Sequence, residues 1–144
     1  MDDKIRYWFQ GFEQGVAALG TSQQEALFHE CGKNCVQQGT LEFYQSLYRT
    51  AEGNLDRFFK AVNDTPGLRG EVVEPDTVYL LAFAQCSCPL VTEGYVRSPR
   101  LCECSRQSVL YVLRTLWPEK RFEVTLCGTI LRGAKECACR ITVQ

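Results

Sequence analysis

Two Cys-x-Cys pairs stand in one stretch of the chain, QCSCPLVTEGYVRSPRLCECS, which spans residues 85–105. In an extended backbone, residues i and i+2 point to the same side, so each pair can present two sulfur atoms to one point. Four thiolates are the ligand set of a tetrahedral zinc ion or of an iron–sulfur cluster. The pattern therefore predicts a metal site, with zinc favoured, whereas packing of small apolar cysteines in the core is the alternative. The predicted ligands are Cys86, Cys88, Cys102 and Cys104.

A third pair of cysteines, Cys31 and Cys35, lies in the segment HECGKNC. Side chains four residues apart lie on one face of a helix, so the two thiols can act together. They are alternative metal ligands that could replace one Cys-x-Cys pair, or resolving thiols for such a pair. Packing against neighbouring apolar residues is an equally open interpretation.

Cys102 and Cys104 immediately precede a helix that is predicted to begin at Ser105. The N-terminus of a helix favours negative charge, which lowers the pKa of a thiol and makes it a better nucleophile. Arg100 and Arg106 would add to this effect if they point inward. Catalysis by a Cys–His pair would need the fold to bring the only histidine, His29, to one of these two cysteines.

Composition favours an ordinary soluble protein. The chain has 144 residues, of which 45% are hydrophobic and 23% are charged, and a net charge of −1. Such a balance gives no field that would attract nucleic acid or an anionic membrane, so neither is an expected partner. The acidic start MDDK does not resemble a signal peptide, and we expect a cytoplasmic protein. Nine cysteines in a reducing compartment are expected to be free or metal-bound rather than paired in disulfides.

Hydrophobic spacing separates the chain into a helical half and a mixed half. Apolar residues recur at helical intervals through residues 4–19 and 22–38, and then from Thr40 and from Asn54, so residues 1–63 are predicted to be helical. Residues 63–76 contain two prolines and two glycines and are predicted to be a loop. Residues 77–85 are predicted to form a strand covered on both faces. A helix from Ser105 to about Leu116 should end at Pro118.

The C-terminal residues are predicted to form an antiparallel hairpin with a two-residue turn at Gly133 and Ala134. This register places Leu126 against Ile141, Val124 against Val143 and Ile130 against Cys137. It also places Cys127 on the opposite face from Cys137 and Cys139, unless a bulge at Gly128 reverses the order. The prediction is therefore a single α+β domain over residues 1–144. It has a helical N-terminal half followed by an antiparallel β-sheet with one long helix packed on it.

The C-terminal half also resembles a known family. The segments CSCPLV (86–91), LCECS (101–105), FEVTLCGTILRG (122–133) and ECACRITV (136–143) resemble 4-vinyl-reductase-like domains and the related bacterial 2-amino-thiazoline-4-carboxylate-hydrolase-like proteins. In that pattern Cys127, Gly133 and Cys137 match a hairpin cysteine, a glycine turn and a second cysteine. Cys139 stands where a large apolar residue is expected, which makes it a poor candidate for a shared ligand. Over residues 77–144 the resemblance implies a small-molecule-binding α+β unit whose cysteines are suspected of holding zinc.

These observations predict a cytoplasmic, cysteine-rich, small-molecule-binding or sensor-like domain with a thiolate zinc site. The helical half would wall a pocket over the sheet, and a homodimer is one option for its assembly. The first alternative is a hydrolase of a small cyclic amide-like or thiazoline-like substrate, with Cys102 or Cys104 as the nucleophile, or with a zinc-bound water in that role. The second is a thiol redox protein, in which Cys31 and Cys35 exchange a disulfide with a Cys-x-Cys pair.

Overall fold

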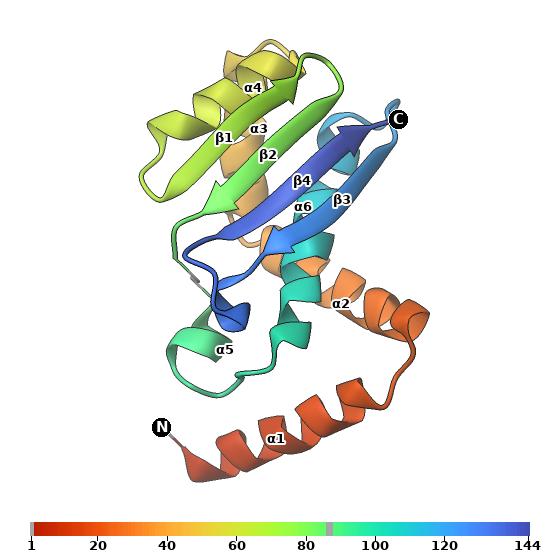
Figure 1. Ribbon diagram of the computed structural model, residues 1–144, viewed down its shortest axis with the longest axis vertical. Helices are drawn as coiled ribbons and strands as arrows, with labels where there is room; N and C mark the ends of the chain where they lie inside the picture. Colours follow the sequence, from red (N-terminus) through yellow and green to blue (C-terminus); the bar gives the residue numbers. More distant parts are fainter. Residues whose placement is uncertain (1, 86–87) are drawn as a thin grey trace.

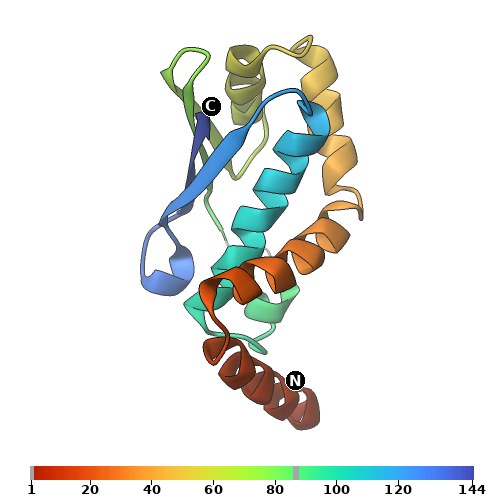
Figure 2. The same ribbon diagram turned by 90° about the vertical axis from the view of Figure 1, so that its right-hand side faces the viewer.

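A four-stranded antiparallel sheet forms one layer of the protein, and helices pack on one of its faces (Figures 1 and 2). The computed structural model describes residues 2–85 and 88–144. The strands are β1 (Leu68–Glu74), β2 (Val78–Phe83), β3 (Phe122–Gly128) and β4 (Cys137–Val143), in the order β1-β2-β4-β3. The predicted α+β class, with a helical N-terminal half followed by an antiparallel sheet and a long helix, is confirmed.

The helices of the first half begin and end within a few residues of their predicted limits. They are α1 (Asp3–Ala17), α2 (Thr21–Val36), α3 (Thr40–Thr50) and α4 (Leu55–Ala61). The second half of the chain contains the short helix α5 (Pro89–Thr92) and the long helix α6 (Cys102–Leu116). The side chain of Asn54 caps α4 by accepting a hydrogen bond from the backbone N–H of Arg57. The long helix α6 ends before Pro118 as predicted, but it begins at Cys102, three residues earlier than the Ser105 start. This earlier start changes the directions of two candidate thiols.

The predicted loop over residues 63–76 is wrong, because it contains the edge strand β1. The side-chain amide of Asn63 binds both backbone groups of Gly70 in this strand. Its Nδ2 donates to the carbonyl oxygen at 2.9 Å, and its Oδ1 accepts from the N–H at 3.0 Å. Gly70 is required here, because a Cβ would collide with the backbone carbonyl of Phe59 at the end of α4. The glycine that suggested a turn in fact permits close packing of a strand against a helix.

The β3–β4 hairpin keeps the predicted apolar face but not the predicted register. Val124 pairs with Ile141 and Leu126 with Cys139, a shift of two residues from the predicted pairing. The connection is longer than a two-residue turn, because it includes a 3₁₀ turn over Ile130–Arg132 that ends at Gly133 with a φ of 90°. A shift of two residues preserves side-chain parity, which explains why the inward-facing residues were still predicted correctly.

The main core lies between the inner face of the sheet and the helices. From the sheet, Tyr79, Leu81, Val124 and Ile141 are buried, and they meet Phe58, Phe59, Leu113 and Trp117 from α4 and the α6 end. The indole N–H of Trp117 donates to the carbonyl oxygen of Gly53 at 2.9 Å, which satisfies its polar atom within this core. The helices cover one face of β2 rather than both, so Leu80 is only half-buried.

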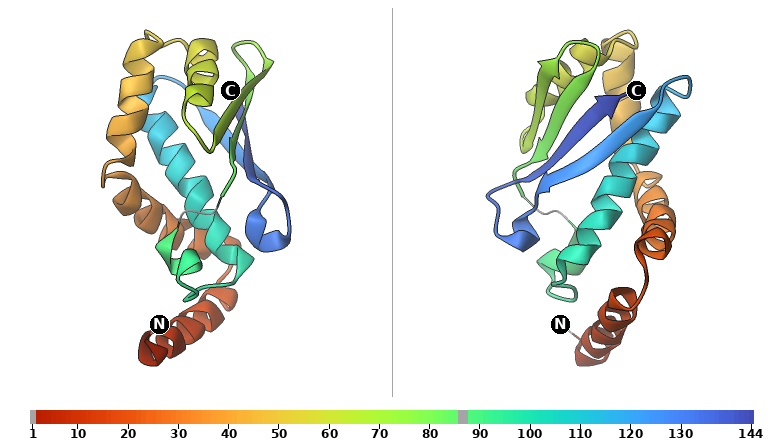
Figure 3. Two further views of the ribbon diagram at one scale, coloured as in Figure 1. Left: turned by 90° about the vertical axis from the view of Figure 1, so that its left-hand side faces the viewer. Right: turned by 45° about the vertical axis from the view of Figure 1, so that its right-hand side comes forward.

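Helix α1 lies at one end of the protein, away from the sheet, and therefore does not wall a pocket over it (Figure 3). It is held at its second half, where the carboxylate of Glu13 accepts hydrogen bonds from the N–H groups of Arg97 (2.8 Å) and Ser98 (3.0 Å). Its first half leaves Tyr7 and Trp8 exposed. Among the helices of residues 2–85 and 88–144, none has the length and apolar character needed to cross a membrane.

Candidate functional site

The Cys102-x-Cys104 pair lies in the first turn of α6 and not in an extended segment. Residues two apart on a helix point about 200° apart, so the prediction that these two thiols share one side is wrong. Cys102 is buried and Cys104 is half-buried. The other predicted ligands are Cys88, which is half-buried at the N-cap of α5, and Cys86, which lies outside the described residues. The two cysteines of α6 consequently belong to two different groups of thiols.

The first group, which we call the hairpin thiol group, joins the start of α6 to the β3–β4 hairpin. Its members are Cys102, Cys127, Cys137 and Cys139. Burial, reinforced by the charges of Cys127 and Cys137, raises the pKa of Cys139 to about 12, with a smaller contribution from Cys102. A strand irregularity between Leu126 and Gly128 includes Cys127, at the place where a bulge was considered from the sequence. The Sγ of Cys137 accepts a hydrogen bond from the N–H of Ile130 at 3.3 Å.

The second group, which we call the helix thiol group, joins α2, the start of α5 and the start of α6. Its members are Cys31, Cys35, Cys88 and Cys104. Burial is the main cause that raises the pKa of Cys104 to about 12, and the neighbouring charges of Cys35, Cys31 and Cys88 raise it further. Cys31 and Cys35 are exposed. The structure thus brings the alternative ligands of α2 to one member of each predicted Cys-x-Cys pair.

The prediction that the pKa of Cys104 is lowered is wrong, because burial raises it and the neighbouring charges of Cys35, Cys31 and Cys88 raise it further. Arg100 is exposed. The Nε of Arg106 donates to both carboxylate oxygens of Glu103, at 2.7 and 2.8 Å, so this guanidinium is paired with Glu103 and not with Cys104. A protonated thiol is a weak nucleophile at neutral pH. His29 lies with its Nδ1 3.2 Å from the side-chain oxygen of Gln107, on the next turn of α6.

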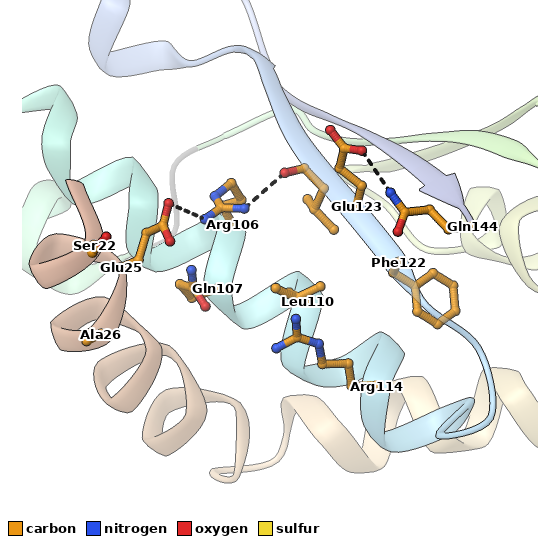
Figure 4. Close-up of a pocket in the computed structure, with 11 residues that line it drawn as sticks. Ser22, Glu25, Ala26, Arg106, Gln107, Leu110, Arg114, Phe122, Glu123 and Gln144 are labelled. Carbon is orange, nitrogen blue, oxygen red and sulfur yellow. Dashed lines mark hydrogen bonds and ion pairs between the residues drawn. The ribbon is translucent and has the colours of Figure 1, made fainter.

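An open cleft of about 510 Å³ lies between α2, α6 and the edge strand β3 (Figure 4). Arg106 stands in its wall, where it contacts Glu25 of α2 at 3.6 Å and donates to the carbonyl oxygen of Val124 at 3.2 Å. Its lining mixes charged and apolar side chains. They are Ser22, Glu25, Ala26, Arg106, Gln107, Leu110, Arg114, Phe122, Glu123, Val124 and Gln144. The sequence offered no signal for this cleft, because its residues are dispersed over four separate segments.

Gln107 connects the cleft to a polar network inside the protein. It is a buried polar residue, 5% exposed, and its Nε2 donates to the carboxylate of Glu103 at 3.2 Å. Its oxygen faces His29, and Glu103 in turn holds Arg106. A buried amide with partners on both sides fixes the positions of those side chains. This network orients Arg106 between the cleft and the hairpin thiol group.

Across residues 2–85 and 88–144, no three His, Cys, Asp or Glu side chains are already arranged to hold a metal ion. Metal binding by either thiol group would therefore require side chains to rotate toward one another. Cys127, Cys31 and Cys35 are exposed, so their side chains can reorient without disturbing the core.

No family model and no curated protein matches the chain. Among solved structures, an H-NOX protein from S. oneidensis in the Fe(II)NO ligation state has a TM-score of 0.49 and 16% identity, and the alignment covers 94% of this chain and 72% of that one. An H-NOX domain from Shewanella oneidensis in the Fe(II)CO state has a TM-score of 0.42 and 16% identity, covering 84% and 63%. A trafficking protein particle complex subunit 3 from Naegleria fowleri, covalently bound to palmitic acid, has a TM-score of 0.42 and 14% identity, covering 96% and 92%. Similarity at this level assigns no ligand to the chain, and the vinyl-reductase-like resemblance stays a prediction.

Proposed function

We propose that the protein is a cytoplasmic small-molecule-binding, sensor-like domain in which Cys102, Cys127 and Cys137 hold a zinc ion. The observation that carries the proposal is the hairpin thiol group, in which cysteines from α6, β3 and β4 come together. Thiolates are preferred zinc ligands, and three of them leave a fourth position for water or a bound molecule. Two of the three, Cys127 and Cys137, are also the cysteines that match the vinyl-reductase-like pattern.

Electrostatics supports a cation at this position. Burial is the main cause that raises the pKa of Cys139, and the charges of Cys127 and Cys137 raise it further, because adjacent thiolates repel one another. A divalent cation reverses this effect, because its charge stabilises the thiolate and displaces the proton. Cys139 is only 1% exposed and belongs to the hydrophobic core, so we assign it a packing role behind the three ligands.

The cleft supports the small-molecule part of the proposal. Its volume of about 510 Å³ lies in the range of small-ligand sites. Arg106 lines the cleft, and its charge also acts on Cys139 in the hairpin thiol group. A ligand that displaced Glu25 from Arg106 would change the charge near the metal site. This shared arginine gives a physical route by which ligand binding and metal binding could influence each other.

Elemental analysis of anaerobically purified protein tests the metal assignment. The Cys127→Ser/Cys137→Ser variant should contain about one zinc per chain less than the wild type, and the zinc that it loses should resist weak chelators in the wild type. Removing that zinc should lower the Tm of the wild type but not of the variant. The matched control is Ser105→Ala, which changes an exposed residue beside both thiol groups and should retain the zinc. Full zinc content in the double variant would refute the proposed ligands.

If the protein is a hydrolase, a zinc-bound water is a better candidate for the nucleophile than a cysteine thiol. A zinc ion held by Cys102, Cys127 and Cys137 would lower the pKa of a water molecule bound at its open fourth position and would so supply a nucleophile. The raised pKa of Cys104 argues against that thiol as the attacking group. Hydrolysis of a thiazoline-like substrate that persists in Cys104→Ser and disappears in the Cys127→Ser/Cys137→Ser variant would support the zinc-dependent form.

A further inference from the structure

We propose that Cys31, Cys35, Cys88 and Cys104 form a second thiolate site, which takes a soft divalent cation such as Zn²⁺ and is separate from the hairpin site. Its four cysteines come from three segments, α2, the start of α5 and the start of α6. The inference is independent of the proposed function, because the two sites share no ligand.

The α2 side of the site consists of two exposed thiols on one helical face. Cys31 and Cys35 are four residues apart in α2, and both are exposed. Cysteines that serve only to fill a core are among the most buried residues, so packing does not explain this pair. Paired ligands one helical turn apart are a common way for one helix to supply two donors to a metal.

Close contact between α2 and α6 brings Cys104 to this pair. Gly32, next to Cys31, is buried against α6, where a Cβ would lie 2.9 Å from the carbonyl oxygen of Cys104. The hydroxyl of Ser108 lies 2.9 Å from the same carbonyl oxygen and 3.4 Å from that of Gly32. Glycine at this position allows the two backbones to approach as no other residue would. This contact places the backbone of Cys104 beside the segment of α2 that carries Cys31 and Cys35.

Cys88 supplies the fourth thiol from the connection between β2 and α6. It is the N-cap residue of α5, where its carbonyl oxygen accepts hydrogen bonds from the N–H groups of Val91 and Thr92, both at 2.9 Å. Its charge, with those of Cys35 and Cys31, acts on Cys104 and adds to the effect of burial on the pKa.

Four thiolates complete a closed tetrahedral shell, in contrast to the three-ligand hairpin site. Each cysteine that becomes a ligand releases one proton, and neither the metal nor sulfur changes its oxidation state. The exposed thiols of Cys31 and Cys35 would rotate inward as the cation binds. The bound ion would tie α5 to α2 and α6.

Cadmium titration of reduced, metal-free protein under anaerobic conditions tests the site, because cadmium–thiolate bonds absorb in the ultraviolet. The wild type should bind two equivalents, and Zn²⁺ should displace both. The Cys31→Ser/Cys35→Ser variant should bind one equivalent, as should the Cys127→Ser/Cys137→Ser variant. Because Cys31 and Cys35 are exposed, their replacement should leave the Tm of the metal-free protein unchanged.

Alkylation mapped by mass spectrometry gives a second readout. Zn²⁺ should protect Cys31, Cys35, Cys88 and Cys104 even in the Cys127→Ser/Cys137→Ser variant. Unprotected Cys31 and Cys35, or two equivalents bound by the Cys31→Ser/Cys35→Ser variant, would overturn the inference. Loss of metal only from the Cys127→Ser/Cys137→Ser variant would overturn it while sparing the proposed function. Loss only from the Cys31→Ser/Cys35→Ser variant would uphold it and refute the proposed function.

Discussion

Gly32 of α2 packs directly against the carbonyl oxygen of Cys104, where an added Cβ would lie at 2.9 Å. The hydroxyl of Ser108 would lie at the same 2.9 Å. Because the obstructing carbonyl belongs to the backbone of a helix, a methyl group at Gly32 would force α2 and α6 apart. This contact positions the helix thiol group relative to α6.

The Gly32→Ala variant should therefore lose about 1–3 kcal/mol of unfolding free energy, although alanine favours a helix more than glycine does. Urea denaturation followed by circular dichroism measures the loss. Gly15→Ala in α1 is the matched control, because a Cβ there has open space and should increase stability by up to about 1 kcal/mol. Equal stabilities for the two variants would contradict the close contact.

A hydrogen bond between Tyr79 and Asp56 predicts a pH-dependent contribution to stability. The phenol of Tyr79 donates to the carboxylate of Asp56 at 2.6 Å, and the N–H of Asp76 donates to the same oxygen at 3.0 Å. These two bonds lower the pKa of Asp56. A carboxyl whose folded pKa lies below its unfolded value stabilises the fold above the unfolded value, and that contribution is lost as the pH falls through the folded pKa.

The stability difference between the wild type and Asp56→Asn should therefore be about 1 kcal/mol at pH 7 and should shrink below about pH 4. Urea titrations across this range would measure it. Asp64→Asn changes an exposed carboxylate on the neighbouring turn and should show little difference at any pH. A difference for Asp56→Asn that grew on acidification would have the wrong sign for this hydrogen bond.

The thiol of Cys104 should react slowly in the metal-free protein. Its pKa of about 12 leaves little thiolate at pH 8, and alkylation proceeds through the thiolate. We expect iodoacetamide to label exposed Cys127 at least about tenfold faster than Cys104, and labelling of Cys104 to accelerate with each unit of pH above 8. Peptide mapping by mass spectrometry gives both rates. Preferential labelling of Cys104 at pH 7 would restore the nucleophile interpretation.

Local sequence signals predicted most of the helices and strands but failed where tertiary contacts decide the conformation. Apolar spacing placed α1 to α4, β2 and the end of α6 at Pro118. The strand β1 was missed because Gly70 and the surrounding polar residues are typical of a loop. What makes this segment a strand is the side chain of Asn63 and the close packing on α4, neither of which leaves a pattern in the sequence.

The sequence singled out candidate thiols but did not predict how they are grouped. Cys31, Cys35, Cys102 and Cys104 were predicted as candidate metal ligands, and that role stays a prediction. Their grouping depended on whether residues 102–104 are extended or helical, and a start of α6 three residues earlier reversed the direction of one thiol. Element ends are the least certain part of any sequence-based prediction, because the backbone groups there lack fixed partners.

Removing the charge of the largely buried Arg106 should lower the unfolding free energy more than removing the charge of an exposed arginine. Its side chain is 20% exposed, and it bonds to Glu103, whose side chain is 19% exposed, and to the carbonyl oxygen of Val124. Arg106→Met would leave the Glu103 carboxylate half-buried without its cation, so we expect a loss of about 1–3 kcal/mol of unfolding free energy, measurable by urea denaturation.

Arg69→Met is the control, because Arg69 pairs with Glu136 at 2.6 Å but is 46% exposed, and such pairs contribute about 0–1 kcal/mol. If both variants lost the same amount, burial would not be what gives the Arg106 network its strength. If Arg106→Met also lowered zinc content in the reduced protein while Arg69→Met did not, the coupling between the cleft and the hairpin thiol group would be supported.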